Sequence, residues 1–299
     1  MADIPFNREL EFTHGEVDQV SPLIRRVIAN NPSAFTFHGT GTYIVGHGKV
    51  AVIDPGPDMP VHVDALKRAI DGETVTHIVI THTHRDHSPA ARALQSATGA
   101  PTYGYGPHGS GRGGVAGEQV EEGADWDFDP DHKVGDGDAI AGDGWTLEAV
   151  WTPGHTSNHL CFGLAEEKAL FTGDHVMGWS TTIVSPPDGD MRRYIDSLRK
   201  LLPRDDVRYW PTHGAPIDDP QNYVRAYIAH REQRERQILE CLSHGVETIP
   251  DMVTRMYADI PAGLHRAAGR SVLSHLIHLV EDGRVKSDGE PNPNARYTL

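Results

Sequence analysis

The sequence predicts a protein of mixed α and β structure with a helical C-terminal region. Short runs rich in β-branched and apolar residues, such as 75–80, are typical of buried strands. In the first 220 residues they alternate with segments of helical periodicity, whereas the helical pattern prevails afterwards. We therefore predict two domains, residues 1–220 and 221–299.

The N-terminal part begins with three predicted strands, 20–29, 41–45 and 50–53. The last two form a predicted hairpin, and turn residues from Asp54 onward end the third strand. Because Asp54 stands at a strand end, we interpret it as a support for a ligand side chain. Residues 61–70 place apolar side chains on one face and predict an amphipathic helix.

The segment Thr-His-Thr-His-Arg-Asp-His at 81–87 follows the strand predicted at 75–80. His82 and His84 are two apart on extended backbone, so both imidazoles leave the same side and can meet one ion. Asp86 and His87 follow where the chain turns and point toward a second ion. An alanine-rich helix is predicted over 90–97.

Three later stretches carry the same kind of residue beside a glycine. His155, Asp174 and His213 each follow a short apolar run, at 145–151, 169–171 and 207–210. A single histidine is more often an ordinary surface or hydrogen-bonded residue. Five histidines and two aspartates at the ends of four strands instead predict a metal site.

Residues 104–144 differ in character, being rich in glycine and acidic residues. The simpler interpretation is a solvated surface insertion. The alternative is a mobile lid, in which Trp126 and Phe128 close over substrate and Arg112 contacts an anionic group.

Helices are predicted at 194–202, 222–242, 249–257 and 264–280, followed by a two-stranded wing at 283–285 and 296–299. Three helices and a wing resemble a winged-helix module. The helix predicted at 264–280 carries a polar stripe that would contact bases in a DNA-binding protein. A solvated face or a subunit contact is the preferred interpretation, because this region has no basic excess. The stripe consists of Arg266, Arg270, Ser274 and His278.

The net charge of −15 lies in residues 1–220, which hold 17 Lys and Arg against 32 Asp and Glu. Such a body disfavours broad nucleic-acid binding but does not exclude a nucleic acid held by metal ions. No apolar run approaches membrane-spanning length and no signal-peptide core begins the chain, which favours a cytoplasmic protein. Cys161 and Cys241 are not expected to form a disulfide.

The order HxHxDH (82–87), GH (154–155), GD (173–174) and HG (213–214) resembles the metallo-β-lactamase-fold hydrolase superfamily. Residues 31–46, 53–56 and 152–156 resemble a narrower branch, that of the endoribonuclease β-lactamase-like protein two and its bacterial relatives. The chain departs from that branch at Ala34, where proline is expected, and at Gly41, where asparagine is expected.

The resemblance implies an α+β fold, a four-layer αβ/βα sandwich with the metals at one edge, and a C-terminal winged-helix-like domain. It also implies that His82, His84 and His155 bind one zinc ion. Asp86, His87 and His213 would bind a second, and Asp174 would bridge the two. Iron or manganese would also suit such a site. A hydroxide shared by the metals would attack the substrate, with Asp86 and Asp174 as the catalytic carboxylates.

Three functions remain open. The first is an endoribonuclease on single-stranded RNA, and the second is a thioesterase resembling glyoxalase II, or another acyl hydrolase of small esters and thioesters. The third is a non-enzymatic DNA-binding protein, which the seven-ligand set disfavours. Asp174 also disfavours a true zinc β-lactamase, in which cysteine or serine is usual. His159 and His175 are candidate acids for the leaving group, although a structural role is preferred, and a homo-oligomer is compatible with the sequence.

Overall fold

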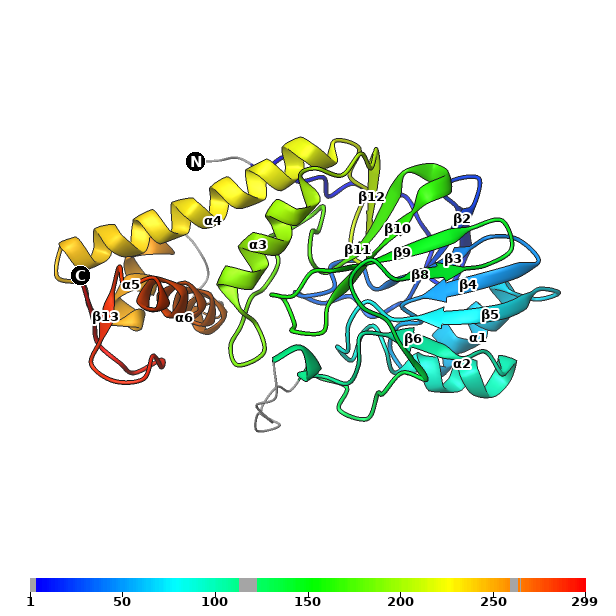
Figure 1. Ribbon diagram of the computed structural model, residues 1–299, viewed down its shortest axis with the longest axis horizontal. Helices are drawn as coiled ribbons and strands as arrows, with labels where there is room; N and C mark the ends of the chain where they lie inside the picture. The colour runs from blue at the N-terminus through cyan, green and yellow to red at the C-terminus, as the bar shows by residue number, and fades with distance from the viewer. Residues whose placement is uncertain (1–3, 113–122, 259–262, 264) are drawn as a thin grey trace.

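The computed structural model describes residues 4–112, 123–258, 263 and 265–299. Figure 1 shows two sheets with helices on their outer sides and a separate helical cluster at the C-terminal end. Within the described residues the first sheet holds seven strands in chain order: β1 (Val17–Gln19), β2 (Ile24–Ile28), β3 (Gly41–Val45), β4 (Lys49–Ile53), β5 (Thr74–Val79), β6 (Thr102–Gly104) and β7 (His132–Lys133). Pairing is antiparallel from β1 to β4 and parallel from β4 to β7.

The second sheet has the strand order β12-β11-β10-β9-β8 in the part of the chain that the structure describes. Its strands are β8 (Ala139–Ala141), β9 (Thr146–Trp151), β10 (Leu160–Leu164), β11 (Ala169–Gly173) and β12 (Arg208–Pro211). All neighbours are antiparallel except β11 and β12, which are parallel. The carboxyl ends of β11 and β12 therefore lie at the same edge of the sheet.

Three apolar cores separate four layers. Between the sheets, side chains such as Ile53 and Phe162 interdigitate. The helices α1 (Pro60–Ala69) and α2 (Ala90–Thr98) pack on the outer face of the first sheet. The outer face of the second sheet is covered by α3 (Met191–Leu201) and the first half of α4 (Pro220–Ser243). The predicted four-layer αβ/βα sandwich is thus confirmed; two short 3-10 turns, η1 (Ser110–Arg112) and η2 (Ala165–Glu167), lie in its connections.

The C-terminal part forms a fourth core around Met252, Leu276 and Tyr297. The end of α4 packs there with α5 (Ile249–Met256), α6 (His265–Glu281) and the short strands β13 (Lys286–Ser287) and β14 (Tyr297–Thr298). These elements confirm the predicted winged-helix domain. The first wing strand lies a few residues later than predicted.

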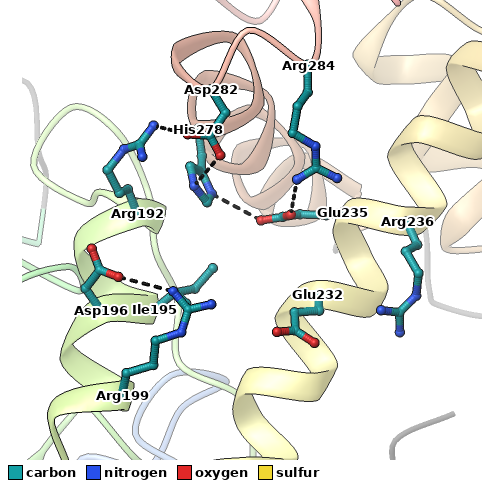
Figure 2. A pocket seen from close by; sticks show the side chains of 10 residues that line it. All are labelled: Arg192, Ile195, Asp196, Arg199, Glu232, Glu235, Arg236, His278, Asp282 and Arg284. Carbon is teal, nitrogen blue, oxygen red and sulfur yellow. Dashed lines mark hydrogen bonds and ion pairs between the residues drawn. The ribbon is translucent and has the colours of Figure 1, made fainter.

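Charged contacts hold α6 against α3 and α4, as Figure 2 shows. Arg192 of α3 donates to Asp282 at 2.6 Å, and Arg284 donates to Glu235 of α4 at 3.0 Å. His278 lies 3.1 Å from the same Glu235 carboxylate. The carboxylate is largely buried, so these contacts are less screened by solvent than ordinary surface ion pairs.

This packing corrects the interpretation of the polar stripe on α6. Arg266 and Arg270 are exposed, but Ser274 is only 2% exposed and His278 is half-buried beside Glu235. Helical periodicity identified a polar face correctly. It could not show that Ser274 is buried and that His278 lies beside Glu235 of α4 rather than in water.

The segment predicted as a solvated insertion or a lid is only partly described, because residues 113–122 lie outside the described ranges. Phe128 is buried in the core under α2, and the Trp126 ring contacts the His108 ring with centroids 4.7 Å apart. The solvated interpretation is therefore wrong for the middle of this segment, around 124–130, whereas most residues of 131–144 are exposed as that interpretation predicts. Arg112, at its beginning, donates to Asp188 at 2.7 Å.

Two further sequence predictions concern the chain as a whole. Cys161 and Cys241 are both free and buried, as expected. In the described part of the chain, every helix is too short or too polar to cross a membrane.

Tyr227 offers a test of the packing of α4 on the second sheet. Its buried hydroxyl lies 2.6 Å from the carbonyl oxygens of Met177 and Ser180 and accepts from the Met177 amide at 3.1 Å. Tyr227→Phe leaves these buried groups unpaired and should lower the free energy of unfolding by about 1–3 kcal/mol in a urea titration. Tyr209→Phe is the matched control, since the buried Tyr209 hydroxyl has no hydrogen-bond partner among the described residues and its removal should cost far less. Equal effects of the two changes would contradict this account.

Candidate metal centre

The seven side chains predicted as ligands meet at one edge of the sandwich. They follow β5, β9, β11 and β12, and their ligand atoms form three overlapping groups in which all atoms lie within 4.8 Å of one another. The groups are His82, His84 and His155; His82, His87 and Asp174; and Asp86, His87 and His213. Strands from both sheets therefore supply one cluster.

The first group consists of three imidazoles. Nδ1 of His84 lies 3.0 Å from Nε2 of His82 and 3.0 Å from Nε2 of His155. The three nitrogen atoms thus converge from two different strand ends. This is the arrangement that alternation along extended backbone predicts for His82 and His84.

Asp174 lies between the group of His82, His84 and His155 and the group of Asp86, His87 and His213. One of its carboxylate oxygens, Oδ1, is 3.4 Å from Nε2 of His213 and 3.6 Å from Nε2 of His87. The other, Oδ2, is 3.7 Å from Nε2 of His155. In the last of these groups, Oδ2 of Asp86 lies 3.1 Å from Nε2 of His213. The Asp174 carboxylate thus faces both groups.

Glycines allow the ligand loops to lie close to neighbouring backbone and side chains. Gly154, directly before His155, has φ +141°, and a Cβ there would collide with the backbone of Tyr194 in α3. Gly173, directly before Asp174, has φ +50°, and its Cβ would lie 2.6 Å from the His159 ring. The glycine beside each ligand is therefore a steric requirement of the site.

The donor set fits divalent cations. Nε2 of His87, Oδ1 of Asp174 and Nε2 of His213 are buried and have no hydrogen-bond partner within the described residues. Leaving such a group unsatisfied costs about 1–3 kcal/mol, so three of them in one cluster indicate a missing ligand. Imidazole nitrogens with carboxylate oxygens suit zinc and also iron or manganese.

The electrostatics of the cluster also favour bound cations. Burial and the neighbouring imidazoles of His87 and His84 hold the pKa of His82 well below its usual value, so this ring is neutral and able to bind a metal. Burial works to raise the pKa of Asp174, but His213 and His87 outweigh it and keep the carboxyl ionised. The ionised carboxylates need positive charge beside them, which cations or protonated imidazoles can supply.

Asp54 supports the site from behind, as predicted. Its carboxylate accepts from the Thr81 amide at 2.8 Å, from the Thr81 hydroxyl at 2.7 Å and from Nδ1 of His87 at 2.8 Å. The Thr212 hydroxyl of the other sheet donates to it at 3.1 Å. A proton held on Nδ1 leaves Nε2 of His87 free to face the cluster. Asp54 also has φ +48°, an uncommon conformation for a residue other than glycine.

Two ligands are oriented by backbone carbonyls that sequence reasoning missed. Nδ1 of His155 donates to the Ile183 carbonyl at 2.6 Å, and Nδ1 of His213 donates to the Gly39 carbonyl at 3.1 Å. Both contacts direct Nε2 into the cluster. A carbonyl acceptor has no side-chain signature, so no pattern in the sequence could have indicated these contacts.

Asp188 was likewise missed as a positioning residue. Its side chain is fully buried, accepts from the Ser157 amide at 2.9 Å and lies 3.6 Å from Nε2 of His108. His108 in turn contacts the hydroxyl of Thr83, which stands between two ligands, at 2.9 Å. Asp188 thus connects the loop of His155 to the segment of His82 and His84. In the sequence it is only one polar residue of a proline-rich turn.

The two histidines considered as acids are buried. Nδ1 of His159 contacts the Thr152 hydroxyl at 2.9 Å, and its Nε2 accepts from the Asp174 amide at 3.2 Å. Burial lowers the pKa of His175 to about 3 and that of His159 well below its usual value. Neutral, buried rings in these positions fit the structural role.

Comparison with known proteins places this centre in a family. The Metallo-beta-lactamase superfamily profile matches residues 36–213, and that of the Beta-lactamase associated winged helix domain matches residues 248–294. The chain therefore belongs to the metallo-β-lactamase superfamily and is an enzyme of its hydrolase class. The winged helix domain and the similarity to a β-lactamase-like protein 2 homolog are consistent with the narrower branch that the sequence resembles.

Individual relatives cover nearly the whole chain. The Beta-lactamase-like protein 2 homolog of Caenorhabditis elegans is 33% identical over 92% of this chain and 90% of its own length. The Atrochrysone carboxyl ACP thioesterase of a Cryptosporiopsis species is 30% identical over 90% of this chain and 83% of its own. A metallo-beta-lactamase family protein of Thermus thermophilus shares the fold with a TM-score of 0.74 and 23% identity, over 93% of this chain and 99% of that one.

Replacement of Asp54 tests the support of the site. Asp54→Asn keeps the size of the side chain but cannot accept from all of its donors, so the metal affinity should fall about 10- to 100-fold. Competition with a coloured chelator measures this affinity. Asp64→Asn, at an exposed position of α1, is the control and should bind metal normally. An unchanged affinity in Asp54→Asn would contradict the supporting role.

Proposed function

We propose that the chain is a di-metal hydrolase whose preferred substrates are thioesters. His82, His84 and His155 would hold one divalent cation, Asp86, His87 and His213 the second, and Asp174 both. The observation that carries the proposal is the convergence of these side chains in overlapping groups with three unpartnered buried atoms. Zinc is the preferred metal and the cytoplasm the expected compartment, with iron or manganese as alternatives.

When bound, two such cations lower the pKa of a water and stabilise negative charge on the substrate. The chain itself has to accept the proton that the attacking water releases. Asp86 is suited to this task because its side chain is 27% exposed, whereas that of Asp174 is 11% exposed. Asp86 can therefore pass the proton on to solvent.

The leaving group favours a thioester. A ribose alkoxide needs a proton donor, and the two histidines considered for that role are buried with lowered pKa values. A thiol has a pKa of about 8.5, so a thiolate can leave at neutral pH with little assistance. The groups present at the centre thus suit acyl transfer to water from sulfur better than cleavage of a phosphodiester.

The loops that orient the ligands also carry exposed apolar side chains. The segment of Gly39 exposes Phe35 to 61%, and Ile183, whose carbonyl binds His155, is 41% exposed. In the first of these segments, the ring of Phe37 stacks on the ring of Trp179, with ring centroids 4.7 Å apart. Apolar residues next to a polar centre suit the acyl part of a substrate. A relative named as an acyl carrier protein thioesterase supports the same choice.

Single-stranded RNA is the second candidate. The similarity to the β-lactamase-like protein 2 homolog, the winged helix domain and the exposed Arg266 and Arg270 favour it. The acidic charge of residues 1–220 opposes it, because binding to RNA gains affinity from cations that neutralise phosphates. A purely DNA-binding role has less support, since Ser274 is buried and His278 lies beside Glu235 of α4, so that only Arg266 and Arg270 of the polar stripe are exposed.

Hydrolysis assays with zinc-loaded protein test the proposal. An acyl thioester of N-acetylcysteamine should be hydrolysed, and Asp174→Ala should lower the rate at least about a hundredfold because a ligand to both cations is lost. Asp143→Ala, at an exposed loop position, is the matched carboxylate control and should keep the activity.

A short single-stranded RNA serves as the competing substrate in the same assay. Cleavage of RNA without thioester hydrolysis, abolished in Asp174→Ala, would replace the thioesterase proposal by the nuclease. Thioester hydrolysis that persists in Asp174→Ala would refute the metal-based mechanism.

A further inference from the structure

A groove of about 460 Å³ lies beside the candidate centre. One wall comes from Gly154 and Ser157, which flank His155, and from the turn at 186–190. The opposite wall comes from Ser274, Ile277 and neighbouring residues of α6. The groove therefore begins at a loop that carries a predicted metal ligand and ends at the winged-helix domain.

Two serine hydroxyls in these walls have no partner. Oγ of Ser157 and Oγ of Ser274 are buried and make no hydrogen bond within the described residues, and the two residues are 3% and 2% exposed. A buried hydroxyl without a hydrogen-bond partner lowers the stability of the fold, so two of them in one groove indicate a bound molecule that hydrogen-bonds to them. Because a serine side chain has three staggered χ1 positions, each hydroxyl can turn toward a ligand in the groove.

Arg112 and Arg193 bring positive charge to the same groove. Arg112 is held by Asp188 through Nε at 2.7 Å, and Arg193 donates through Nη1 to the Gly111 carbonyl at 2.8 Å. The acidic residues of the groove are already engaged. Asp190 accepts from the first turn of α3 at 3.0 Å, and Glu281 accepts from Arg192 at 3.3 Å. Nε of Arg193 also lies 3.8 Å from Asp190, so Nη2 of Arg193 and the two Nη atoms of Arg112 are the nitrogens that can bind an anionic group.

The rest of the wall is apolar, formed by Pro186, Pro187, Met191 and Ile277. An occupant should therefore have methylene or methyl groups along its length, a few groups for the hydroxyls, and one anionic end. RNA fits this description poorly, because it carries a charge at each nucleotide and its bases stack on aromatic rings. Among the described residues that line the groove, His278 is the one aromatic ring.

The geometry points to this groove as the binding site for the phosphopantetheine arm of a thioester substrate. The arm is elongated and largely uncharged, contains two amides, and ends in a phosphate. Its amides would meet Ser157 and Ser274, and its phosphate would meet Arg112 and Arg193, while the thioester lies at the metal centre. This inference rests on the proposed thioesterase function. Coenzyme A and acyl carrier proteins share the arm and are the two sources of such a substrate.

Calorimetric binding of non-hydrolysable S-propyl thioethers tests the inference without requiring turnover. The thioether of coenzyme A should bind zinc-loaded protein at least about tenfold more tightly than that of N-acetylcysteamine, which lacks most of the arm. Ser274→Ala should weaken binding of the coenzyme A thioether about three- to tenfold, because one hydrogen bond is lost. Ile277→Trp, which fills the groove, should weaken it further.

Controls separate the groove from the metal centre. Neither variant should change binding of the N-acetylcysteamine thioether, and Arg270→Ala, an exposed change one turn earlier on α6, should leave all affinities unchanged. Equal affinity for the long and short thioethers, or indifference of the long one to both variants, would overturn the inference. A single-stranded RNA that binds in the groove instead, with the same sensitivity to Ile277→Trp, would also overturn it.

The same experiment separates this inference from the proposed function. Binding of the coenzyme A thioether that depends on Ser274 and Ile277, in a protein that hydrolyses no thioester, would support the groove and refute the thioesterase. Hydrolysis of the short thioester with no preference for the long one would support the thioesterase and refute the groove as a binding site for the arm. A carrier protein bearing the same thioether serves as a further arm. Tighter binding of the carrier protein identifies it as the source, and tighter binding of coenzyme A identifies the free cofactor.

Discussion

The buried carboxylate of Asp54 is the contact on which the geometry of the centre depends. It stands directly after β4 and binds the backbone and side chain of Thr81 after β5, the ring of His87 and the hydroxyl of Thr212 after β12. A single side chain thus ties the edges of both sheets to one ligand. Charge-assisted hydrogen bonds in a dry environment are strong, and a buried carboxylate without them would be very costly. The two halves of the sandwich therefore have one low-energy alignment at this edge, which is where the ligands converge.

Local patterns in the sequence were sufficient for the strands that precede the predicted ligands, whereas the strand predicted at 20–29 is instead two strands, β1 and β2. β3 begins and ends at the predicted residues, and the strands before the ligands differ from prediction by one or two residues, because apolar runs closed by glycine or proline have clear ends. The side chains that converge at this edge were recognisable by their type and position, and their role as ligands stays a prediction. The four layers, by contrast, came from resemblance to a family, since periodicity cannot show which helix covers which sheet.

What the sequence did not show depends on contacts between distant segments. Phe128 lies in an acidic stretch and is nevertheless buried, because α2 offers it an apolar surface. Ser274 lies on a polar helical face and is nevertheless buried. Asp188 is one of several polar residues in a turn, and its importance comes from Ser157 and His108, which are 31 and 80 positions away. Tertiary packing decides each of these cases.

These contacts also explain how a winged-helix domain can serve a hydrolase. The ion pair of Arg192 with Asp282 fixes the end of α6 beside α3, and that of Arg284 with Glu235 fixes it beside α4. The helix that would read DNA in a nucleic-acid-binding relative thus becomes one wall of a groove. In the opposite wall, Asp188 accepts hydrogen bonds from the Ser157 amide, in the loop of His155, and from the Arg112 side chain. A ligand that binds between these walls therefore contacts the wall in which the buried Asp188 carboxylate connects Arg112 to the loop of His155. A substrate arm in the groove would place the reacting bond by the same contacts that position the ligand loop, which is how binding energy from a remote part of a substrate contributes to catalysis.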